Sequence, residues 1–448
     1  MNAPDIHVGI IRTPQLEFRL SGEFRIDGSD RLCRNSCMAR VKHGKLHITA
    51  GDDAIESDKE VAFLPCTPDS DYFEIKDVII GVDFHWEQKQ HLMYRGSLKL
   101  LLSGNAMEVI NVVPVEDYLY SVISSEMSAE APLALLKAHA IISRSWLLSQ
   151  IQQERKPKPE GNAHTLTGTG DGEYIRWYDH QDHSDFHVCA DDHCQRYQGI
   201  QMIRNENVIR AVDETRGAVL MYQNGICDAR YSKACGGVSE SFENCWEPER
   251  HPYLQSVVDR KGSSDGSKLN LKVEEKARAF ILGHPEAFCN TSDKKILSSV
   301  LNTYDQETRA FYRWTVQYSQ SDLSALLMDR SGIDFGRIKA LRPLERGDSG
   351  RLVKLEIEGT KKRLVIGKEL TIRRWLSKSH LYSSAFLVEA LDLDKEGVPG
   401  RFIFHGAGWG HGVGLCQIGA AVMAEEGYSH AEILLHYYKG AEIKKQYS

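Results

Sequence analysis

The chain has 448 residues, of which 42% are hydrophobic and 26% charged, a composition typical of globular rather than disordered or fibrous proteins. Its 55 basic and 62 acidic residues leave a formal net charge of −7, which argues against a protein that holds nucleic acid through its overall field. Ten cysteines in this length are too dilute for a small fold held together by disulfides. The opening residues MNAPDIHVGI lack the basic start and apolar core of a signal peptide, so none is predicted here.

Short β-rich stretches separated by Gly, Asp and Pro fill the first hundred residues. They predict strands at 6–11, 16–20, 73–84 and 97–102. After Pro114 the spacing of apolar residues becomes helical, and it predicts helices at 115–127 and 132–151. Further along, we expect strand-like pieces at 200–259, mostly helices at 271–329 and strands again at 341–372.

The C-terminal region contains a segment, His405–Ala424, without Asp, Glu, Lys or Arg. Its many glycines make it too weakly apolar for a membrane-spanning helix. A helix is expected at 417–426, and Ser429 followed by Glu432 predicts a capping box for a last helix that ends near Gly440. Helices and strands in this mixed order indicate an α+β fold rather than an alternating doubly wound sheet.

Histidines and cysteines are concentrated between residues 177 and 199. Neutral imidazole and thiolate are the ligands that Zn²⁺ prefers, and a structural site uses four of them in a tetrahedron. The spacing predicts a zinc site that would organise this loop. The preferred ligands are His183, Cys189, His193 and Cys194, and His187 is the alternative to His183. The other interpretation is a set of surface histidines with two ordinary thiols.

Glu126 stands at the break between the two predicted helices, in SSEMSAEAP. A carboxyl at such a junction can be half buried against Met127, and burial raises the pKa of a carboxyl toward the range of a general acid. On the next helix Lys137 and Arg144 are seven residues apart, so they share a face that can hold a polar ligand. An exposed loop glutamate and a solvated helix edge remain the alternatives.

The motif HGAGWGHGVGLCQIGAA alternates glycine with other residues. Because it differs from G-x-G-x-x-G and no phosphate-loop lysine follows, a nucleotide site is not predicted. Glycine lets the backbone approach a ligand or another strand closely. Trp409 can then stack on a sugar ring, with His411 and Gln417 as hydrogen-bond partners. The alternative is a tightly packed structural loop.

Taken together, the chain resembles the SpoIID/LytB domain family in four segments, VPVEDYLYSVISSEMSAEAPLALLKAHAIISRSWLLS, DFHVCADDHCQRYQG, YSKACGGVSE and GWGHGVGLCQIGAAVMAEEGYSHAEILLHYYKG. The resemblance covers roughly residues 105–260 and 340–448, with the motifs in the family's order. This family includes the sporulation lytic transglycosylase and the amidase-enhancer proteins that act on peptidoglycan. The chain departs from the pattern at His187, where Asp is more usual, and at Ser128, where Pro is common.

The resemblance implies that Glu126 is the catalytic acid/base, and that the Cys-x-x-x-His-Cys element belongs to the zinc site seen in some members. It also implies that Lys137 and Arg144 line a glycan groove. Ser232, Trp409, His411 and Gln417 complete the set of residues expected to bind substrate. The implied activity is lytic cleavage of MurNAc–GlcNAc strands with formation of 1,6-anhydro-MurNAc, in the cell envelope outside the cytoplasm. The main alternative is a non-catalytic wall-binding enhancer of an N-acetylmuramoyl-L-alanine amidase, which would then be a partner; a zinc-stabilised carbohydrate-binding module is a third.

The domain organisation expected from this resemblance has a SpoIID-like core in two parts, 105–262 and 341–448. An N-terminal β-rich accessory domain would occupy 1–104, and a mostly helical insertion would occupy 263–340. The expected fold class is α+β, with peptidoglycan glycan strands as the partner and with neither nucleic acid binding nor a membrane span.

Overall fold

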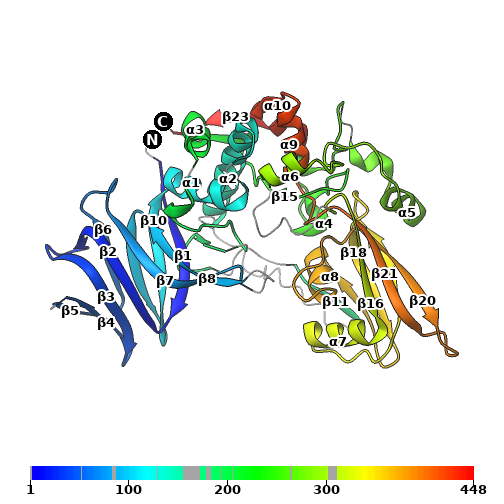
Figure 1. The fold of residues 1–448 in the computed structure, drawn as a ribbon, viewed down its shortest axis with the longest axis horizontal. Coiled ribbons are helices and arrows are strands. Elements are labelled where there is room, and N and C mark those ends of the chain that lie inside the picture. Colours follow the sequence, from blue (N-terminus) through cyan, green and yellow to red (C-terminus); the bar gives the residue numbers. More distant parts are fainter. Residues whose placement is uncertain are drawn as a thin grey trace. The chain divides into compact units, whose positions relative to one another are not determined.

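The computed structural model describes the residues 3–51, 53–82, 87–128, 130–154, 172–177, 183–191, 193–203, 205–262, 265–300 and 310–447. The chain divides into two compact units, both of which contain helices and strands (Figure 1). The first unit comprises residues 1–155, 180–219 and 444–448, and the second comprises 156–179 and 220–443. The expected α+β class is confirmed.

A single large sheet forms the base of the first unit. In the described part of the chain it has 11 strands, in the order β12-β1-β10-β9-β6-β2-β3-β4-β5, with β7 paired to β2 and β8. The strands are β1 (Asp5–Thr13), β2 (Gln15–Ile26), β3 (Leu32–Lys42), β4 (Lys45–Ala50), β5 (Asp53–Ser57), β6 (Glu60–Pro65), β7 (Tyr72–Ile80), β8 (Gln88–Tyr94), β9 (Ser97–Ser103), β10 (Ala106–Pro114) and β12 (Val188–Cys189). Along β2, Leu16 and Phe18 are buried while Glu17 between them is exposed, the alternation expected of a strand with one covered face.

Helices α1 (Val115–Glu126) and α2 (Leu133–Glu154) confirm the two helices predicted after Pro114. The first follows β10 without a loop, and Figure 1 shows it beside that strand. It ends at Glu126 because Met127 adopts an extended backbone, with φ −144° and ψ 171°. A third helix, α3 (Glu206–Glu214), lies where the sequence suggested strand-like pieces. Its start is capped by the Asn205 side chain, which accepts a hydrogen bond from the Asn207 N–H.

The second unit contains several smaller sheets. One is β11-β19-β18-β17, another is β16-β21-β20, and short pairs join β13 to β14 and β15 to β22. The strands of this unit are β11 (Glu173–Ile175), β14 (Gly225–Ile226), β15 (Tyr231–Ser232), β16 (Arg313–Ser319), β17 (Ile338–Arg346), β18 (Leu352–Gly359), β19 (Arg363–Gly367), β20 (Phe386–Leu393), β21 (Pro399–Ala407) and β22 (Leu415–Cys416). Two further strands, β13 (Ala218–Tyr222) and β23 (Glu442–Lys445), have residues in both units. The helices are α4 (Phe242–Cys245), α5 (Glu274–Leu282), α6 (Lys294–Val300), α7 (Gln320–Ser331), α8 (Glu369–Trp375), α9 (Gln417–Glu425) and α10 (His430–Tyr437).

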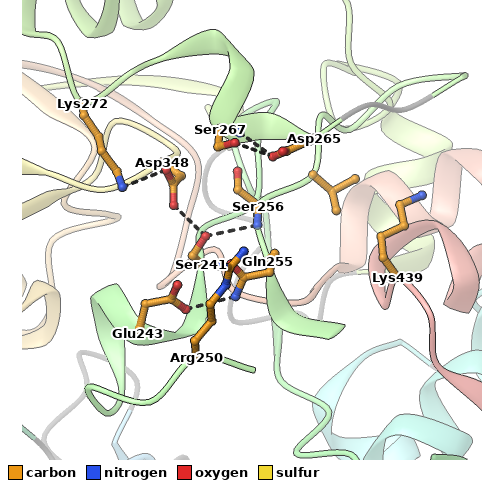
Figure 2. Close-up of a pocket in the computed structure, with 11 residues that line it drawn as sticks. Ser241, Glu243, Arg250, Gln255, Ser256, Asp265, Ser267, Lys272, Asp348 and Lys439 are labelled. Carbon is orange, nitrogen blue, oxygen red and sulfur yellow. Dashed lines mark hydrogen bonds and ion pairs between the residues drawn. The ribbon is translucent and has the colours of Figure 1, made fainter. Parts of the chain in front are cut away.

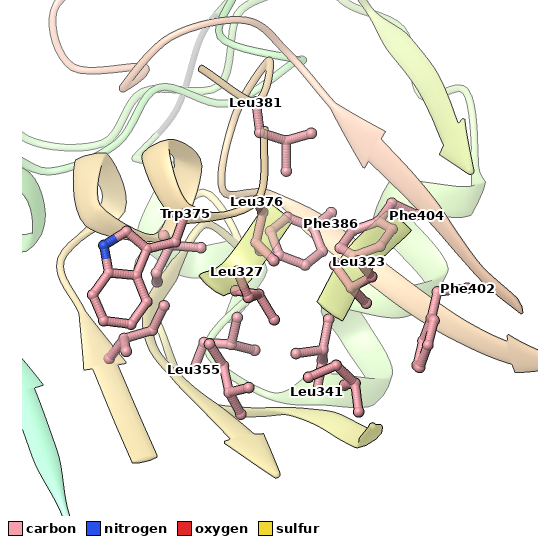
Figure 3. Packing of buried hydrophobic residues seen from close by; sticks show 14 of the residues in the cluster. Leu323, Leu327, Leu341, Leu355, Trp375, Leu376, Leu381, Phe386, Phe402 and Phe404 are labelled. Atoms are coloured by element: carbon pink, nitrogen blue, oxygen red, sulfur yellow. The ribbon is translucent and has the colours of Figure 1, made fainter. Parts of the chain in front are cut away.

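A hydrophobic core of this unit is filled by side chains from its two larger sheets and from α7 and α8 (Figure 3). Leu323 and Leu327 of α7 are fully buried, as are Leu355 of β18 and Phe404 of β21. Burying one such side chain contributes about 1.5–3 kcal/mol relative to leaving it in water. The core therefore holds the two sheets and the helices as one folded unit.

Two sequence expectations for this unit were wrong in part. The stretch 271–329 contains the strand β16 as well as helices, because it completes the sheet with β21. The stretch 341–372 ends in α8 rather than in a strand. Part of the first stretch, 301–309, lies outside the described residues, as do the last two residues of the strand expected at 73–84.

The predictions for the C-terminal region agree with the structure. The Ser429–Glu432 capping box is present at the start of α10, and α9 follows the expected range closely. The uncharged segment 405–424 is divided among β21, a loop, β22 and α9. Among the described helices, none is both long enough and apolar enough to cross a membrane.

Candidate functional site

The four preferred zinc ligands of the first unit come together in the structure. One nitrogen or sulfur atom from each of His183, Cys189, His193 and Cys194 lies within 4.8 Å of the others. The Cys194 Sγ is 3.5 Å from the His183 Nε2 and 3.4 Å from the His193 Nδ1, and the Cys189 Sγ is 3.9 Å from the same His193 atom. In a tetrahedral zinc site, Zn–S and Zn–N bonds of about 2.3 and 2.0–2.1 Å place such atoms about 3.5 Å apart. These donors fit a zinc ion.

The loop that carries these ligands is attached to the edge of the large sheet. Its strand β12 pairs in parallel with β1, where Val188 and Cys189 lie opposite Val8 and Gly9. Gly9 is needed for a close approach, because a Cβ there would lie 2.5 Å from the ring of Phe186. That ring in turn packs against the His183 ring, with 4.6 Å between the centroids. The sheet edge thus positions one of the ligands through a single aromatic contact.

His187, the alternative fourth ligand, points elsewhere. Its Nδ1 accepts a hydrogen bond of 3.1 Å from the backbone N–H of His7, and the two rings pack with 4.9 Å between centroids. The geometry therefore favours His183 over His187 as the fourth ligand.

This difference leads to a test by metal analysis. We expect His183→Ala and Cys194→Ser each to lower the zinc content by about one ion per chain, because three candidate ligands would remain of the four. His187→Ala should keep the zinc content of the wild type, and so should Cys66→Ser, since Cys66 is an exposed thiol of the same unit. Elemental analysis of the purified proteins checks this. Equal zinc content in wild type and Cys194→Ser would contradict the assignment.

Glu126 is connected to this loop through one hydrogen bond. The half-buried carboxylate at the end of α1 accepts a bond of 2.9 Å, on Oε1, from the backbone N–H of Arg196. Arg196 is only two residues beyond Cys194, so the segment that carries a candidate metal ligand also orients the candidate catalytic carboxyl. The sequence does not reveal this contact, because the donor is a backbone group.

The segment 195–198 is itself tightly bound to the helices. The Tyr118 and Tyr197 rings stack with 5.1 Å between centroids, and the Tyr197 hydroxyl donates a 2.6 Å hydrogen bond to the Asn111 side chain. The backbone N–H of Gln198 donates to the Ser121 hydroxyl at 3.2 Å. Such contacts leave little freedom to the backbone that holds Glu126.

Lys137 and Arg144 do not form the open basic face that the sequence suggested. Lys137 makes an ion pair with Glu214 of α3. The Arg144 side chain is completely buried and holds Glu116 through two contacts, Nε to Oε1 at 3.1 Å and Nη2 to Oε2 at 2.6 Å. Because helix α2 packs against α1 and α3, these two cations form ion pairs with carboxylates of the neighbouring helices instead of facing solvent.

The other residues expected to contact glycan lie in the second unit, around the pairing of β15 with β22. Trp409 is half buried between Phe311 and Tyr382, with centroid distances of 4.8 and 4.5 Å. Its backbone exchanges hydrogen bonds with Ala234, which are 2.7 and 3.1 Å long. Ser232 and Gln417 are almost fully buried, at 6% and 4% exposure. Of these three residues, only Trp409 is partly exposed.

His411 lies in the same region and is half buried. Its Nδ1 accepts a 3.0 Å hydrogen bond from the Val413 backbone, and its ring meets the edge of Trp246 at 5.0 Å. Burial, with the nearby Arg230 guanidinium, holds the pKa of His411 well below its ordinary value. A neutral imidazole held by its own loop is suited to maintaining the shape of that loop.

A polar pocket of about 510 Å³ also belongs to the second unit (Figure 2). Its lining combines carboxylates, cations, hydroxyls and an amide with one apolar side chain, that of Val257. The other lining residues are Ser241, Glu243, Arg250, Gln255, Ser256, Asp265, Ser267, Lys272, Asp348 and Lys439. Lys272 pairs with Asp348 at 3.1 Å, and the Ser241 hydroxyl donates to the same carboxylate at 2.7 Å. Donors and acceptors of both signs suit a ligand rich in hydroxyl and amide groups.

The motif residue Glu240 supports one wall of this pocket. Its fully buried carboxylate accepts hydrogen bonds from the backbone N–H groups of Ser241, Asp348 and Ser349, and from the side chains of Asn244 and Ser349. Burial raises the pKa of this carboxyl. The pocket residues are spread from 241 to 439, so no local sequence pattern identifies them.

Comparison with known proteins gives two family matches. Residues 103–222 match the family described as Stage II sporulation protein, SpoIID, and residues 240–414 match a domain of unknown function, DUF8618. The chain is 24% identical to the stage II sporulation protein D of Bacillus amyloliquefaciens over 74% of this chain and 75% of that protein. It is 25% identical to the amidase enhancer of Bacillus subtilis over 53% of this chain and 33% of that protein. An uncharacterised protein of Brachyspira hyodysenteriae is 24% identical over 78% of this chain and 72% of its own length.

The SpoIID match, together with the relatives named stage II sporulation protein D and amidase enhancer, supports assignment of the chain to the SpoIID/LytB family. The SpoIID match includes Glu126 and the four His/Cys residues of the first unit. Trp409 and His411 fall within the second match, whereas Ser232 and Gln417 lie outside both. The family assignment therefore covers the proposed acid/base residue and the candidate metal loop with one continuous segment.

Proposed function

We propose that this SpoIID/LytB family member is a lytic transglycosylase that cleaves peptidoglycan glycan strands with Glu126 as its acid/base. The observation that carries the proposal is the Glu126 carboxylate, half buried at the end of α1 and held on one oxygen by the Arg196 N–H. A positioned, partly enclosed carboxyl with one fixed oxygen is what proton transfer to a substrate oxygen requires.

The proposed reaction uses this carboxyl twice. Protonated Glu126 donates its proton to the glycosidic oxygen between MurNAc and GlcNAc, the C1–O bond of MurNAc breaks, and positive charge develops at C1. The resulting carboxylate then removes the proton from the MurNAc 6-hydroxyl, and O6 bonds to C1. The proton is thus returned to Glu126, and no water is consumed.

The two carboxyls that flank Glu126 in the sequence and could serve as its partner, Glu116 and Glu130, are engaged by other groups. A hydrolase of the usual kind needs a second carboxyl about 5–9.5 Å from the first. Glu116 is 2% exposed and held by Arg144. Glu130 is exposed and accepts a 3.1 Å hydrogen bond from the Asn205 side chain. Their engagement favours the mechanism with a single carboxyl.

The candidate metal loop would support Glu126 rather than take part in the chemistry. Held by His183, Cys189, His193 and Cys194, zinc would cross-link the segments that carry these four residues. The loop would then present the Arg196 N–H to the Glu126 carboxylate in one orientation. In the second unit, the half-buried Trp409 side chain would contact a sugar ring.

The substrate implies that the protein works in the cell envelope outside the cytoplasm, where peptidoglycan lies. A second candidate function is a non-catalytic enhancer of a cell-wall amidase, which is favoured by the similarity to the amidase enhancer of Bacillus subtilis. Under that alternative, the protein would bind glycan strands without cleaving them.

Product analysis separates these functions. Purified peptidoglycan is incubated with the protein, and the soluble products are examined by mass spectrometry. We expect muropeptides that end in 1,6-anhydro-MurNAc. They are lighter than hydrolysis products by one water molecule, about 18 Da, because no water is added in the reaction. Products with reducing ends would indicate a hydrolase, and glycan binding without products would favour the enhancer.

A further inference from the structure

A second cluster of metal-binding side chains lies in the second unit, away in sequence from the His/Cys loop. One sulfur or oxygen atom from each of four fully buried residues lies within 4.8 Å of the others, and these residues are Cys235, Asp259, Cys289 and Cys416. Their exposed fractions are between 0% and 3%. No short motif links them, since they come from four separate segments of the chain.

The separations within the cluster match those around one tetrahedral ion. The Cys235 Sγ lies 3.6 Å from the Cys289 Sγ and 3.4 Å from the Asp259 Oδ2. Zn–S bonds of about 2.3 Å and Zn–O bonds of about 2.1 Å would place two sulfurs about 3.8 Å apart and a sulfur and an oxygen about 3.6 Å apart. The side chains therefore need little movement to coordinate an ion.

The hydrogen bonds around the cluster suit ligands that carry negative charge. The Cys416 sulfur accepts backbone N–H groups from Cys235 at 3.2 Å and from Gly419 at 3.4 Å. The carboxylate of Asp259 accepts the Tyr437 hydroxyl at 2.7 Å and the Cys289 N–H at 3.1 Å. Hydrogen bonds of this kind orient metal ligands from outside the coordination sphere.

Two guanidinium groups next to the cluster are bonded to backbone carbonyls rather than to its four side chains. The Arg351 guanidinium donates to the Cys235 carbonyl at 3.2 Å, and that of Arg313 donates to the Gly236 carbonyl at 2.9 Å. Three thiols and a carboxylate packed together in the buried interior are costly when they are ionised, unless a cation is bound among them. A divalent, thiolate-preferring ion satisfies all four at once.

We propose that these four side chains bind one structural zinc ion, a site additional to the His/Cys loop of the first unit. The ion would cross-link the segment after β15 to the start of α9, since Cys416 precedes that helix and Cys235 lies near Ser232 of β15. These segments flank the loop that carries Trp409, which pairs with Ala234 through its backbone. The site would therefore hold in place the glycine-rich loop of the second unit.

The experiment measures metal on the full chain, purified under reducing conditions without chelator. Native mass spectrometry and elemental analysis should find one zinc ion per chain in Cys194→Ser, where the His/Cys loop is disabled but the second cluster is intact. The double variant Cys194→Ser/Cys289→Ser should have lost that ion. The matched control Cys194→Ser/Cys227→Ser should keep it, because Cys227 is an equally buried thiol of the same unit outside the cluster.

A second measurement does not require the double variant to fold. Addition of Co²⁺ to metal-stripped Cys194→Ser protein should produce the near-ultraviolet charge-transfer absorption of cobalt–thiolate bonds, and Asp259→Asn in that background should weaken Co²⁺ binding at least tenfold. Absence of zinc and of cobalt absorption in Cys194→Ser would overturn the proposal, as would a disulfide between Cys235 and Cys289 in the protein as isolated. Neither result bears on Glu126, so the proposed activity is judged separately.

Discussion

Replacing Glu126 by glutamine should slow the cleavage of glycan strands by about a hundredfold to ten-thousandfold, the range over which general acid–base catalysis acts. Glutamine has the same shape and keeps an oxygen that can accept the Arg196 N–H, at 2.9 Å in the wild type. It cannot donate a proton as an acid does or remove one from the 6-hydroxyl. The rate should therefore fall while folding and glycan binding are retained.

The measurement is the initial rate of release of anhydro-muropeptides, with glycan binding followed by cosedimentation with insoluble peptidoglycan. Glu130→Gln is the matched control, since Glu130 is an exposed carboxyl close in sequence, and its rate should equal that of the wild type. A Glu126→Gln protein that cleaves at the wild-type rate would remove Glu126 from the mechanism.

Loss of the buried Arg144 guanidinium should have the largest effect on the free energy of unfolding. Arg144→Met leaves the Glu116 carboxylate buried, with the Tyr447 hydroxyl at 2.7 Å and the Gly217 N–H at 3.1 Å but without its cation. Removing one member of a buried ion pair costs about 3–5 kcal/mol of unfolding free energy, because the remaining charge is neither solvated nor paired. The large value follows from the complete burial of Arg144.

Urea unfolding followed by circular dichroism tests this expectation. Arg144→Lys should show a smaller loss, and the double change Arg144→Met with Glu116→Leu should recover most of the stability, since no charge is left buried. The control Lys137→Met breaks an ion pair whose Glu214 partner is 39% exposed, and it should cost at most about 1 kcal/mol. Unchanged stability with weaker glycan binding in Arg144→Met would instead support the groove role suggested by the sequence.

The extent to which the sequence predicted this protein differs between its elements. Helices α1 and α2, and the capping box of α10, were predicted because their signals are local: apolar spacing and a Ser three residues before a Glu. The strand β16 and the helix α8 were missed because the residues that pair with β16 are more than eighty positions away in the chain and α8 is only about two turns long. Short elements carry weak signals, and tertiary contacts decide them.

The same distinction applies to the candidate sites. The sequence could point to the candidate His/Cys ligands because most of them lie on one short loop, whereas Cys235, Asp259, Cys289 and Cys416 are brought together by folding alone. Helical spacing correctly placed Lys137 and Arg144 along one helix, but it could not show that Glu214 and Glu116 would neutralise them. Nor could it show that a backbone N–H would orient Glu126.

By itself, the sequence determined the α+β class, the family resemblance, the candidate acid and one candidate metal loop, because each depends on composition or on residues close together in the chain. Its ten cysteines were enough to exclude a disulfide-held miniprotein, but not to assign their roles. Only the tertiary structure chose His183 over His187, buried Arg144 and assembled the second cluster, because each of these depends on which distant segments come into contact and which side chains lose their access to water.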